Sequence, residues 1–452
     1  MWKLLQLKMK KDKWLYILAA LLSFLSVSLI FSCGIWFDES YTLALIKHDY
    51  SDIIAILKDD MHPPLYFLGL KVFCGVFGYS LAATKAFSAI GFLLTLVLGC
   101  TIIKSDFGGK TALAYELFFA CIPMVYYFST QQRCYSWSVF WVTLCFLLGH
   151  RLICRRRNSD ALFFAIAFLF SAYNHIYALI AAAGIALFVN IYFLAKKDWD
   201  ILKILLADVI ILGGYFPWLW SLFFQTKNAV SDFWQTSLEP LSLIVFCGTM
   251  VLFFIIAIKK MYRKLNILFA MYSIVFVQIT GFLVSVIIRP LYIVRYASPL
   301  MGIFALLLAF CFYQFINHKK GIIILSCFIL FQYIAITCFE YSPSWTEFQN
   351  EFAEEYSQND TFIYTDTSFG TFSYYYPENE HISFHYQNWY RAFENITYRE
   401  PSDFLNQKTD NRIWYVVNQK GAIPEWIKQN LKLKRMFSFR NDFNVFDVYL
   451  VI

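Results

Sequence analysis

The adjacent carboxylates Asp38 and Glu39 are the first residues in the sequence whose types suggest chemistry. They lie in the segment Trp36-Phe37-Asp38-Glu39-Ser40-Tyr41, which follows an apolar run at 14–32, and no Lys or Arg within five residues can pair with them. A carboxylate placed at a membrane surface is suited to act as a general base toward a hydroxyl or an amine. The alternative is a solvated loop start in which Asp38 or Ser40 caps a helix.

A second polar group precedes the next apolar run, 62–79. There His62 is followed by Pro63-Pro64, and consecutive prolines fix φ and suppress helix at the entry to the run. His62 in this rigid corner is a candidate to bind a substrate or a metal. A structural hydrogen bond at the membrane interface is the other interpretation.

Isolated arginines beside tyrosines form the third candidate group. Arg133 and Tyr135 lie in a short polar stretch between two apolar runs, and Arg295 and Tyr296 lie before another run. The rigid guanidinium fork matches a phosphate, and a lipid phosphate is the obvious partner at a membrane. Anchoring of the chain among lipid headgroups by Arg and Tyr is the alternative.

The composition defines the class of protein that must position these residues. Of the 452 residues, 59% are hydrophobic and only 15% are charged, whereas soluble domains have about 25% charged residues. This excludes a soluble enzyme, a disordered chain and a nucleic-acid binder. The formal charge is +12 over residues 1–340 and −5 over 341–452, which predicts a transmembrane domain at 1–340 and a soluble domain at 341–452.

The apolar runs and their flanking charges predict the topology. Basic clusters alternate with connections that are poor in Lys and Arg, so the positive-inside rule places the N-terminus in the cytoplasm and the tail 341–452 outside the cell membrane. Run 62–79 breaks this alternation and is expected to be re-entrant or juxtamembrane. The prediction is a polytopic α-helical protein with about 11 crossings, at 14–32, 84–103, 112–129, 134–150, 161–174, 176–195, 201–223, 241–258, 266–288, 297–316 and 321–339.

The tail has the pattern of a small α/β domain. Short β-branched and aromatic runs predict strands at 362–364, 413–417 and 446–452. Helices are expected at 345–357 and 423–431. The tail contains no recognisable nucleophile, metal motif or Gly-rich loop.

These features together resemble the GT-C superfamily of integral-membrane glycosyltransferases. The likeness is closest to the protein O-mannosyltransferase branch and its bacterial relatives, which include the aminoarabinose lipid A transferases. It covers roughly residues 14–340. The motifs that match, in order along the chain, are Asp38-Glu39, His62-Pro63-Pro64-Leu65 and Arg133-x-Tyr135.

The resemblance implies an inverting glycosyltransferase that uses a polyprenyl-phosphate sugar donor and an extracytoplasmic acceptor, which is a glycan, a lipid or a protein. Asp38 matches the family's catalytic base, and Glu39 would hold the acceptor or tune that base. His62 matches the family's histidine before the double proline, near the active-site cavity, and Arg133 matches the arginine of the outer turn. Arg295 is expected to contact the phosphate, and the neighbouring Tyr135 and Tyr296 are grouped with the substrate-binding residues.

Two matters stay open at the level of sequence. No cofactor is firmly implied; a divalent metal remains open, although His48, His62 and His175 are far apart in the chain. The expected partners are the lipid donor, membrane lipid and the acceptor, with no nucleic acid. The alternative functions are a lipid-linked glycan flippase or polymerase, and a transporter.

Overall fold

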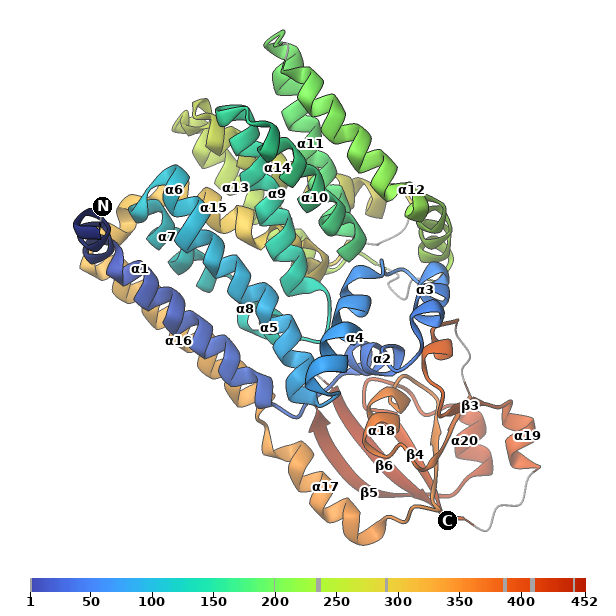
Figure 1. The fold of residues 1–452 in the computed structure, drawn as a ribbon. Helices are drawn as coiled ribbons and strands as arrows, with labels where there is room; N and C mark the ends of the chain where they lie inside the picture. The colour runs from blue at the N-terminus through green and yellow to red at the C-terminus, as the bar shows by residue number, and fades with distance from the viewer. Residues whose placement is uncertain are drawn as a thin grey trace.

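The computed structural model describes residues 2–198, 200–232, 237–288, 292–384, 388–406, 411–441 and 444–452. A bundle of long helices forms one part of the molecule, and a sheet with its own short helices forms the other (Figure 1). The N-terminus lies at the end of the bundle far from the sheet. Helices α2 (Phe37–Leu45), α3 (Tyr50–Asp59) and α4 (Leu65–Phe77) lie between the two parts.

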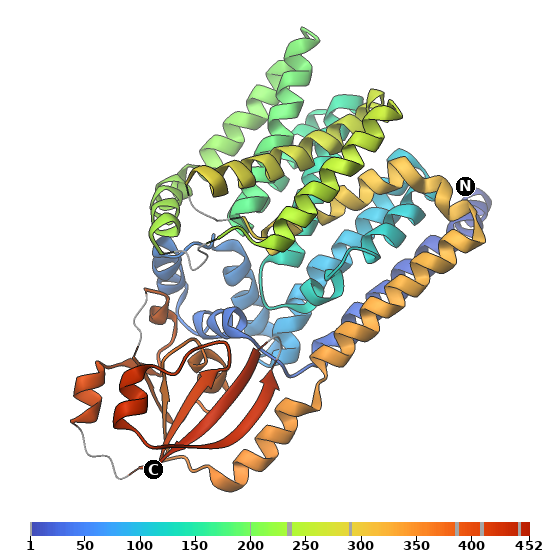
Figure 2. The same cartoon turned by 180° about the vertical axis from the view of Figure 1, so that it is seen from behind.

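The bundle contains the remaining helices of the first three quarters of the chain. The first helix, α1, and the last, α16, lie side by side (Figure 1, Figure 2). The bounds are α1 (Trp2–Ser28), α5 (Leu81–Leu98), α6 (Lys104–Phe107), α7 (Gly109–Ala120), α8 (Val125–Thr130), α9 (Tyr135–Arg155), α10 (Asn158–Asn174), α11 (Ile176–Ala195), α12 (Ile201–Asp232), α13 (Pro240–Ile258), α14 (Leu265–Ile287), α15 (Met301–Phe312) and α16 (Lys319–Glu340).

Nine helical segments among the described residues are long and apolar enough to cross a membrane. Many of their large apolar side chains are exposed, as on α12, α13 and α16, because lipid rather than water is the solvent on that face. The protein is therefore a multi-pass membrane protein, as predicted. The segments are Asp12–Phe31, Leu81–Phe107, Tyr135–Arg155, Ile176–Ala195, Ile201–Gln225, Pro240–Ile258, Leu265–Ile287, Val294–Asn317 and Lys319–Glu355.

Two of the predicted crossings, 112–129 and 161–174, have no counterpart among these segments. The run 112–129 is not one helix, because α7 ends before Pro123 and Met124 adopts a left-handed φ of 64° before α8 begins; proline cannot continue a helix. The run 161–174 lies in α10, whose 17 residues span about 26 Å. The number of 11 crossings stays a prediction.

The run after the double proline forms a short helix. Helix α4 begins at Leu65, directly after Pro64, and has 13 residues, which is about 20 Å. That length is less than a bilayer's hydrocarbon thickness of about 30 Å. The structure thus agrees with the expectation of a segment at 62–79 that does not cross.

Ion pairs gather at the end of the bundle near the N-terminus. Arg151 and Arg155 both pair with Asp106, at 2.7 Å and 2.5 Å, and Lys104 pairs with Asp12 at 2.8 Å. Helix α6, which carries Lys104 and Asp106, lies at the same end as the N-terminus (Figure 1). Two of the basic connections that the sequence places on one side of the membrane, at Lys104 and at Arg151 and Arg155, therefore lie together.

The C-terminal part is an α/β unit built on a sheet. Its described residues form six strands in the order β3-β2-β1-β4-β6-β5, parallel from β3 to β4 and antiparallel from β4 to β5. The elements are α17 (Pro343–Glu355), β1 (Thr361–Tyr364), α18 (Phe369–Tyr375), β2 (Glu380–Ser383), β3 (Ile396–Tyr398), α19 (Pro401–Leu405), β4 (Ile413–Asn418), α20 (Glu425–Asn430), β5 (Leu433–Asn441) and β6 (Asn444–Val451).

The predicted strands and helices of this unit are confirmed, and further elements are added. β1, β4 and β6 correspond to the three predicted strands, and α17 and α20 to the two predicted helices. The sequence did not predict β5, Leu433–Asn441, in which basic and polar residues interrupt the apolar ones. β5 is an edge strand, which pairs with β6 on one side, and edge strands tolerate such residues.

The C-terminal unit packs directly on α2. The Phe37 ring meets the Phe369 ring edge-on at 5.5 Å and stacks with Phe393 at 6.1 Å. A Cβ at Gly370 would overlap the side chain of Ser40. Helix α18 can approach α2 this closely only with glycine at 370, so the sheet unit fixes one face of the helix that carries Asp38.

Candidate active site

Asp38 lies in the first turn of α2, where its side chain faces the start of another segment of the bundle. Its Oδ2 atom is 3.2 Å from Nη1 of Arg295, which belongs to the 3₁₀ helix η4 (Val294–Leu300). The two side chains are 20% and 24% exposed, so the pair is accessible. Asp38 and Arg295 are 257 positions apart in sequence and meet only through the fold.

Arg133 holds the other side of Asp38. It lies in the turn between α8 and α9, and its Nη1 atom donates to the backbone carbonyl of Asp38 at 3.2 Å and to the hydroxyl of Thr42 at 3.3 Å. The residue is only 3% exposed. Two guanidinium groups thus flank the first turn of α2.

His62 joins Arg133 to an aspartate that the sequence did not single out. The ring atom Nε2 lies 2.6 Å from Nη2 of Arg133, and Nδ1 lies 3.0 Å from Oδ2 of Asp60. The hydroxyl of Tyr41 donates to the same Asp60 oxygen at 2.8 Å. Phe67 lies beneath this group, with its ring centre 6.0 Å from the Arg133 guanidinium.

Glu39 points away from its neighbour Asp38 and into the protein. Its carboxylate accepts the backbone N–H of Gln132 at 2.9 Å and that of Trp36 at 3.3 Å. Burial raises the pKa of Glu39 to about 7, opposed by the nearby charge of Lys85. These contacts cap α2 and tie it to the turn that carries Arg133, so Glu39 positions the site. Both of its carboxylate oxygens are bonded to backbone N–H groups, Oε1 to that of Gln132 and Oε2 to that of Trp36.

Tyr135 and Tyr296 meet at a third aromatic ring, that of His175. The ring centres of Tyr135 and His175 are 6.0 Å apart, and those of His175 and Tyr296 are 5.7 Å apart. Tyr135 is buried. Tyr296 and Trp36 lie against the Arg295 guanidinium at 5.4 Å and 5.1 Å. The aromatic residues therefore form a wall that orients Arg295.

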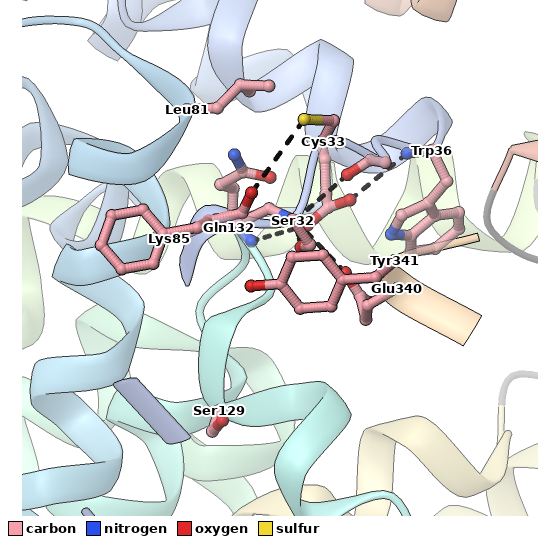
Figure 3. Close-up of polar contacts among 12 residues, drawn as sticks. Ser32, Cys33, Trp36, Leu81, Lys85, Ser129, Gln132, Glu340 and Tyr341 are labelled. Atoms are coloured by element: carbon pink, nitrogen blue, oxygen red, sulfur yellow. Dashed lines mark hydrogen bonds and ion pairs between the residues drawn. The ribbon is translucent and has the colours of Figure 1, made fainter. Parts of the chain in front are cut away.

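A separate buried cluster contains Ser32, Lys85 and Glu340 (Figure 3), and the last two lie near the Glu39 carboxylate. Lys85 of α5 donates to the Ser32 hydroxyl, to the carbonyl of Gly34 at 3.1 Å and to Glu340 at 3.3 Å, and Ser32 donates to the same Glu340 oxygen at 2.6 Å. We call Ser32, Lys85 and Glu340 the support cluster. It ties together the ends of the first, second and last candidate spans.

Each of the two arginines of the site has one donor with no protein partner among the described residues. These donors are the Nε–H groups of Arg133 and Arg295, both inaccessible to solvent. Buried donors are nearly always paired, and a site for an anionic ligand is one reason for an exception. We call Asp38, Asp60, His62, Arg133 and Arg295 the reaction cluster.

The structure brings most of the predicted site residues together. Asp38, His62, Arg133 and Arg295 are linked by direct contacts, and Tyr135 and Tyr296 adjoin them through His175. The sequence reasoning missed Asp60 and Lys85. Asp60 stands two residues before His62, which was a usable signal, whereas nothing local connects Lys85 with Glu340.

Among the described residues, no group of three or more His, Cys, Asp or Glu side chains is arranged to hold a metal ion. His62 lies within hydrogen-bonding distance of Asp60 and Arg133, and His175 accepts the backbone N–H of Tyr177 at 3.2 Å.

Comparison by sequence finds no matching protein-family model and no matching curated protein. Comparison of the fold finds solved structures of ArnT from Cupriavidus metallidurans. The apo structure gives a TM-score of 0.65 at 13% identity, and the structure bound to undecaprenyl phosphate gives 0.63 at 13% identity. Both alignments cover 97% of this chain and 98% of the ArnT chain. This chain shares its fold with ArnT.

ArnT is an aminoarabinose lipid A transferase of the GT-C family. The resemblance predicted from Asp38-Glu39, His62-Pro63-Pro64-Leu65 and Arg133-x-Tyr135 is therefore confirmed at the level of the fold. It extends beyond residues 14–340, because the alignment also includes the C-terminal unit.

Proposed function

We propose that this chain is an inverting glycosyltransferase that moves a sugar from a polyprenyl-phosphate donor to an extracytoplasmic acceptor. The observation that carries the proposal is the accessible Asp38, whose carboxylate pairs with Arg295 and whose backbone carbonyl accepts from Arg133. The fold supports it, because ArnT shares this fold and has been solved with undecaprenyl phosphate.

The two arginines suit the donor's phosphate. Each has a buried Nε–H without a protein partner among the described residues, and guanidinium groups bind phosphate through paired N–H donors. When the sugar leaves, negative charge grows on the phosphate oxygen, and preorganised cations beside it lower the barrier. Arg133 and Arg295 would thus both bind the donor and stabilise the leaving group.

Asp38 would act as the base. Its carboxylate takes the proton from the acceptor's hydroxyl or amine, whose lone pair attacks the anomeric carbon. The bond from that carbon to the phosphate oxygen breaks, and the phosphate leaves with the bonding electrons. A single displacement inverts the anomeric centre and needs only one carboxylate, in agreement with the inward orientation of Glu39. The Asp38–Arg295 ion pair must loosen when the donor phosphate engages Arg295.

The roles of the other predicted residues follow from their contacts. Glu39 holds the start of α2 against the turn that carries Arg133. His62 contacts Arg133 directly. Tyr135 and Tyr296 support Arg295 through the aromatic wall. The partners in this proposal are the lipid-linked sugar, membrane lipid and the acceptor.

The experiment uses the full chain in lipid nanodiscs with undecaprenyl-phosphate-linked sugars as donors and bacterial membrane extracts as acceptors. Transfer releases undecaprenyl phosphate, which mass spectrometry detects without knowledge of the acceptor. Release that requires both the extract and Asp38 supports the proposal. A wild-type chain that neither binds undecaprenyl phosphate nor releases it from any donor would refute the proposal.

The orientation in the membrane belongs to the same proposal: the N-terminus is cytoplasmic and residues 341–452 are extracytoplasmic. Cys33 and Cys154 are both exposed, and they flank predicted outer and inner connections. In variants that keep one of these cysteines alone, a membrane-impermeant maleimide should label Cys33 in intact cells and Cys154 only after permeabilisation. The reverse pattern would invert the topology.

A further inference from the structure

The His62 ring lies between a group that only donates hydrogen bonds and a group that only accepts them. Arginine has five N–H donors and no acceptor, and an ionised carboxylate has acceptors only. Because Nε2 lies 2.6 Å from Arg133 Nη2, it must accept, and because Nδ1 lies 3.0 Å from Asp60 Oδ2, it must donate. In this geometry the ring donates from Nδ1 and accepts at Nε2.

Asp60 is itself held in place by further donors. The Tyr41 hydroxyl reaches Oδ2 at 2.8 Å, and the backbone N–H of Met61 reaches Oδ1 at 2.7 Å. The loop that carries Asp60 is anchored by Gln225 of α12, which is buried and donates to the carbonyl of Leu57 at 2.7 Å. The Asp60 side chain is 15% exposed, so the carboxylate has little freedom to turn toward solvent.

We propose that Asp60 is a positioning residue that fixes the tautomer of His62, so that His62 accepts from Arg133 and aims this guanidinium at the donor phosphate. The inference rests on the proposed function and deepens it. In this arrangement His62 does not itself touch the substrate, because both ring nitrogens are occupied within the protein. The Nε–H of Arg133 has no protein partner among the described residues.

Loss of Asp60 has a defined consequence. Without an acceptor at Nδ1, the His62 proton is free to move to Nε2, which would place one N–H donor against another at Arg133. The Arg133 guanidinium then loses its hydrogen bond to His62 and keeps those to Asp38 and Thr42. A hydrogen bond to a charged group contributes enough that its loss changes an equilibrium constant by about 10-fold or more.

The test measures binding of undecaprenyl phosphate to the full chain in nanodiscs by native mass spectrometry. Asp60→Ala is expected to weaken binding about 10-fold. Asp59→Ala is the matched control, because it removes an adjacent carboxylate that is 60% exposed and pairs with Arg391 instead; its binding should equal that of wild type. Equal affinities for Asp60→Ala and wild type would overturn the inference.

A double-mutant cycle separates positioning from general destabilisation. In an Arg133→Ala background, Asp60→Ala is expected to have no further effect on binding, because its influence passes through Arg133. If Asp60→Ala weakens binding by the same factor in both backgrounds, Asp60 does not act through Arg133 and the inference fails. If wild-type protein does not bind undecaprenyl phosphate at all, the proposed function fails as well.

A conservative replacement of His62 keeps the inference testable should Asp60→Ala not fold. The amide of glutamine offers one donor side and one acceptor side, as the neutral imidazole does. His62→Gln is therefore expected to retain binding within about threefold, whereas His62→Ala loses about 10-fold. Equal losses in the two variants would show that the donor–acceptor order of the ring is irrelevant and would overturn the inference.

Discussion

The reaction cluster and the support cluster contain similar charged residues but differ in satisfaction of their hydrogen bonds and, at Asp38 and Arg295, in exposure. Lys85 and Glu340 are 2% and 10% exposed, and the three donors of the Lys85 ammonium have three protein acceptors. Asp38 and Arg295 are more exposed, and both arginines keep a donor without a protein partner among the described residues.

The comparison separates charged groups whose donors are all paired within the protein from charged groups that keep an unpaired donor among the described residues. A buried ion pair with every hydrogen bond satisfied has nothing left to offer a substrate, and breaking it strands a charge in a dry environment. Substitution of an accessible group with an unpaired donor costs the fold little stability. It removes the hydrogen bond that this donor would offer to a ligand. Glu39 connects the two regions, since its carboxylate lies near Lys85 and Glu340 and holds the backbone at Gln132.

The largest effect is expected from Asp38→Asn. The amide keeps the size of the side chain but cannot take a proton, and general-base catalysis contributes about 10²- to 10⁴-fold. Turnover, measured as release of undecaprenyl phosphate, should fall by that factor. Binding of undecaprenyl phosphate should stay the same or tighten, because a negative charge beside the phosphate is removed. Full turnover in this variant would remove Asp38 from the mechanism.

The support cluster should respond in stability instead. Lys85→Met leaves Glu340 buried without its cation, and loss of one partner of a buried pair costs about 3–5 kcal/mol. The double variant Lys85→Met with Glu340→Met should recover much of this loss, since no charge remains stranded. Thermal unfolding in detergent measures both. If the single variant melts like wild type, the support cluster does not hold the spans together.

Glu39 predicts a pH dependence of stability. Its pKa is about 7 in the folded protein against 4.5 ordinarily, so between these values the folded state binds a proton that the unfolded state releases. The contribution of Glu39 to the free energy of unfolding is fully present below pH 4.5. It falls by about 3 kcal/mol as the pH rises through 7. Glu39→Gln should flatten this part of the melting curve against pH. An unchanged pH profile in Glu39→Gln would assign the dependence to another group.

The smallest effect on stability and turnover is expected from the exposed ion pair between Arg391 and Asp59, at the end of α3. Arg391 and Asp59 are 2.7 Å apart but 48% and 60% exposed, and exposed pairs contribute about 0–1 kcal/mol. Arg391→Ala should therefore change neither the melting temperature nor turnover appreciably. A loss comparable to that of Lys85→Met would contradict the use of exposure to separate the two regions.

Local pattern predicted the parts of the site that are close in sequence. The pair Asp38-Glu39 was placed after the first span, and α4 begins directly after the predicted proline corner. The inward orientation of Glu39 was not predicted, because its partner Gln132 lies 93 positions away. The role of Asp60 was missed because it depends on which ring nitrogen of His62 meets Arg133.

The sequence by itself determined that this is a multi-pass membrane protein with a small α/β unit at its C-terminal end, because hydropathy and strand pattern are local properties of the chain. Only the tertiary structure decided which charged side chains are enclosed with their donors paired and which keep a donor without a partner among the described residues. Asp38 meets Arg295 across 257 positions, and Lys85 meets Glu340 across 255. Exposure and hydrogen-bond satisfaction arise from such distant contacts, and no local pattern of residues encodes them.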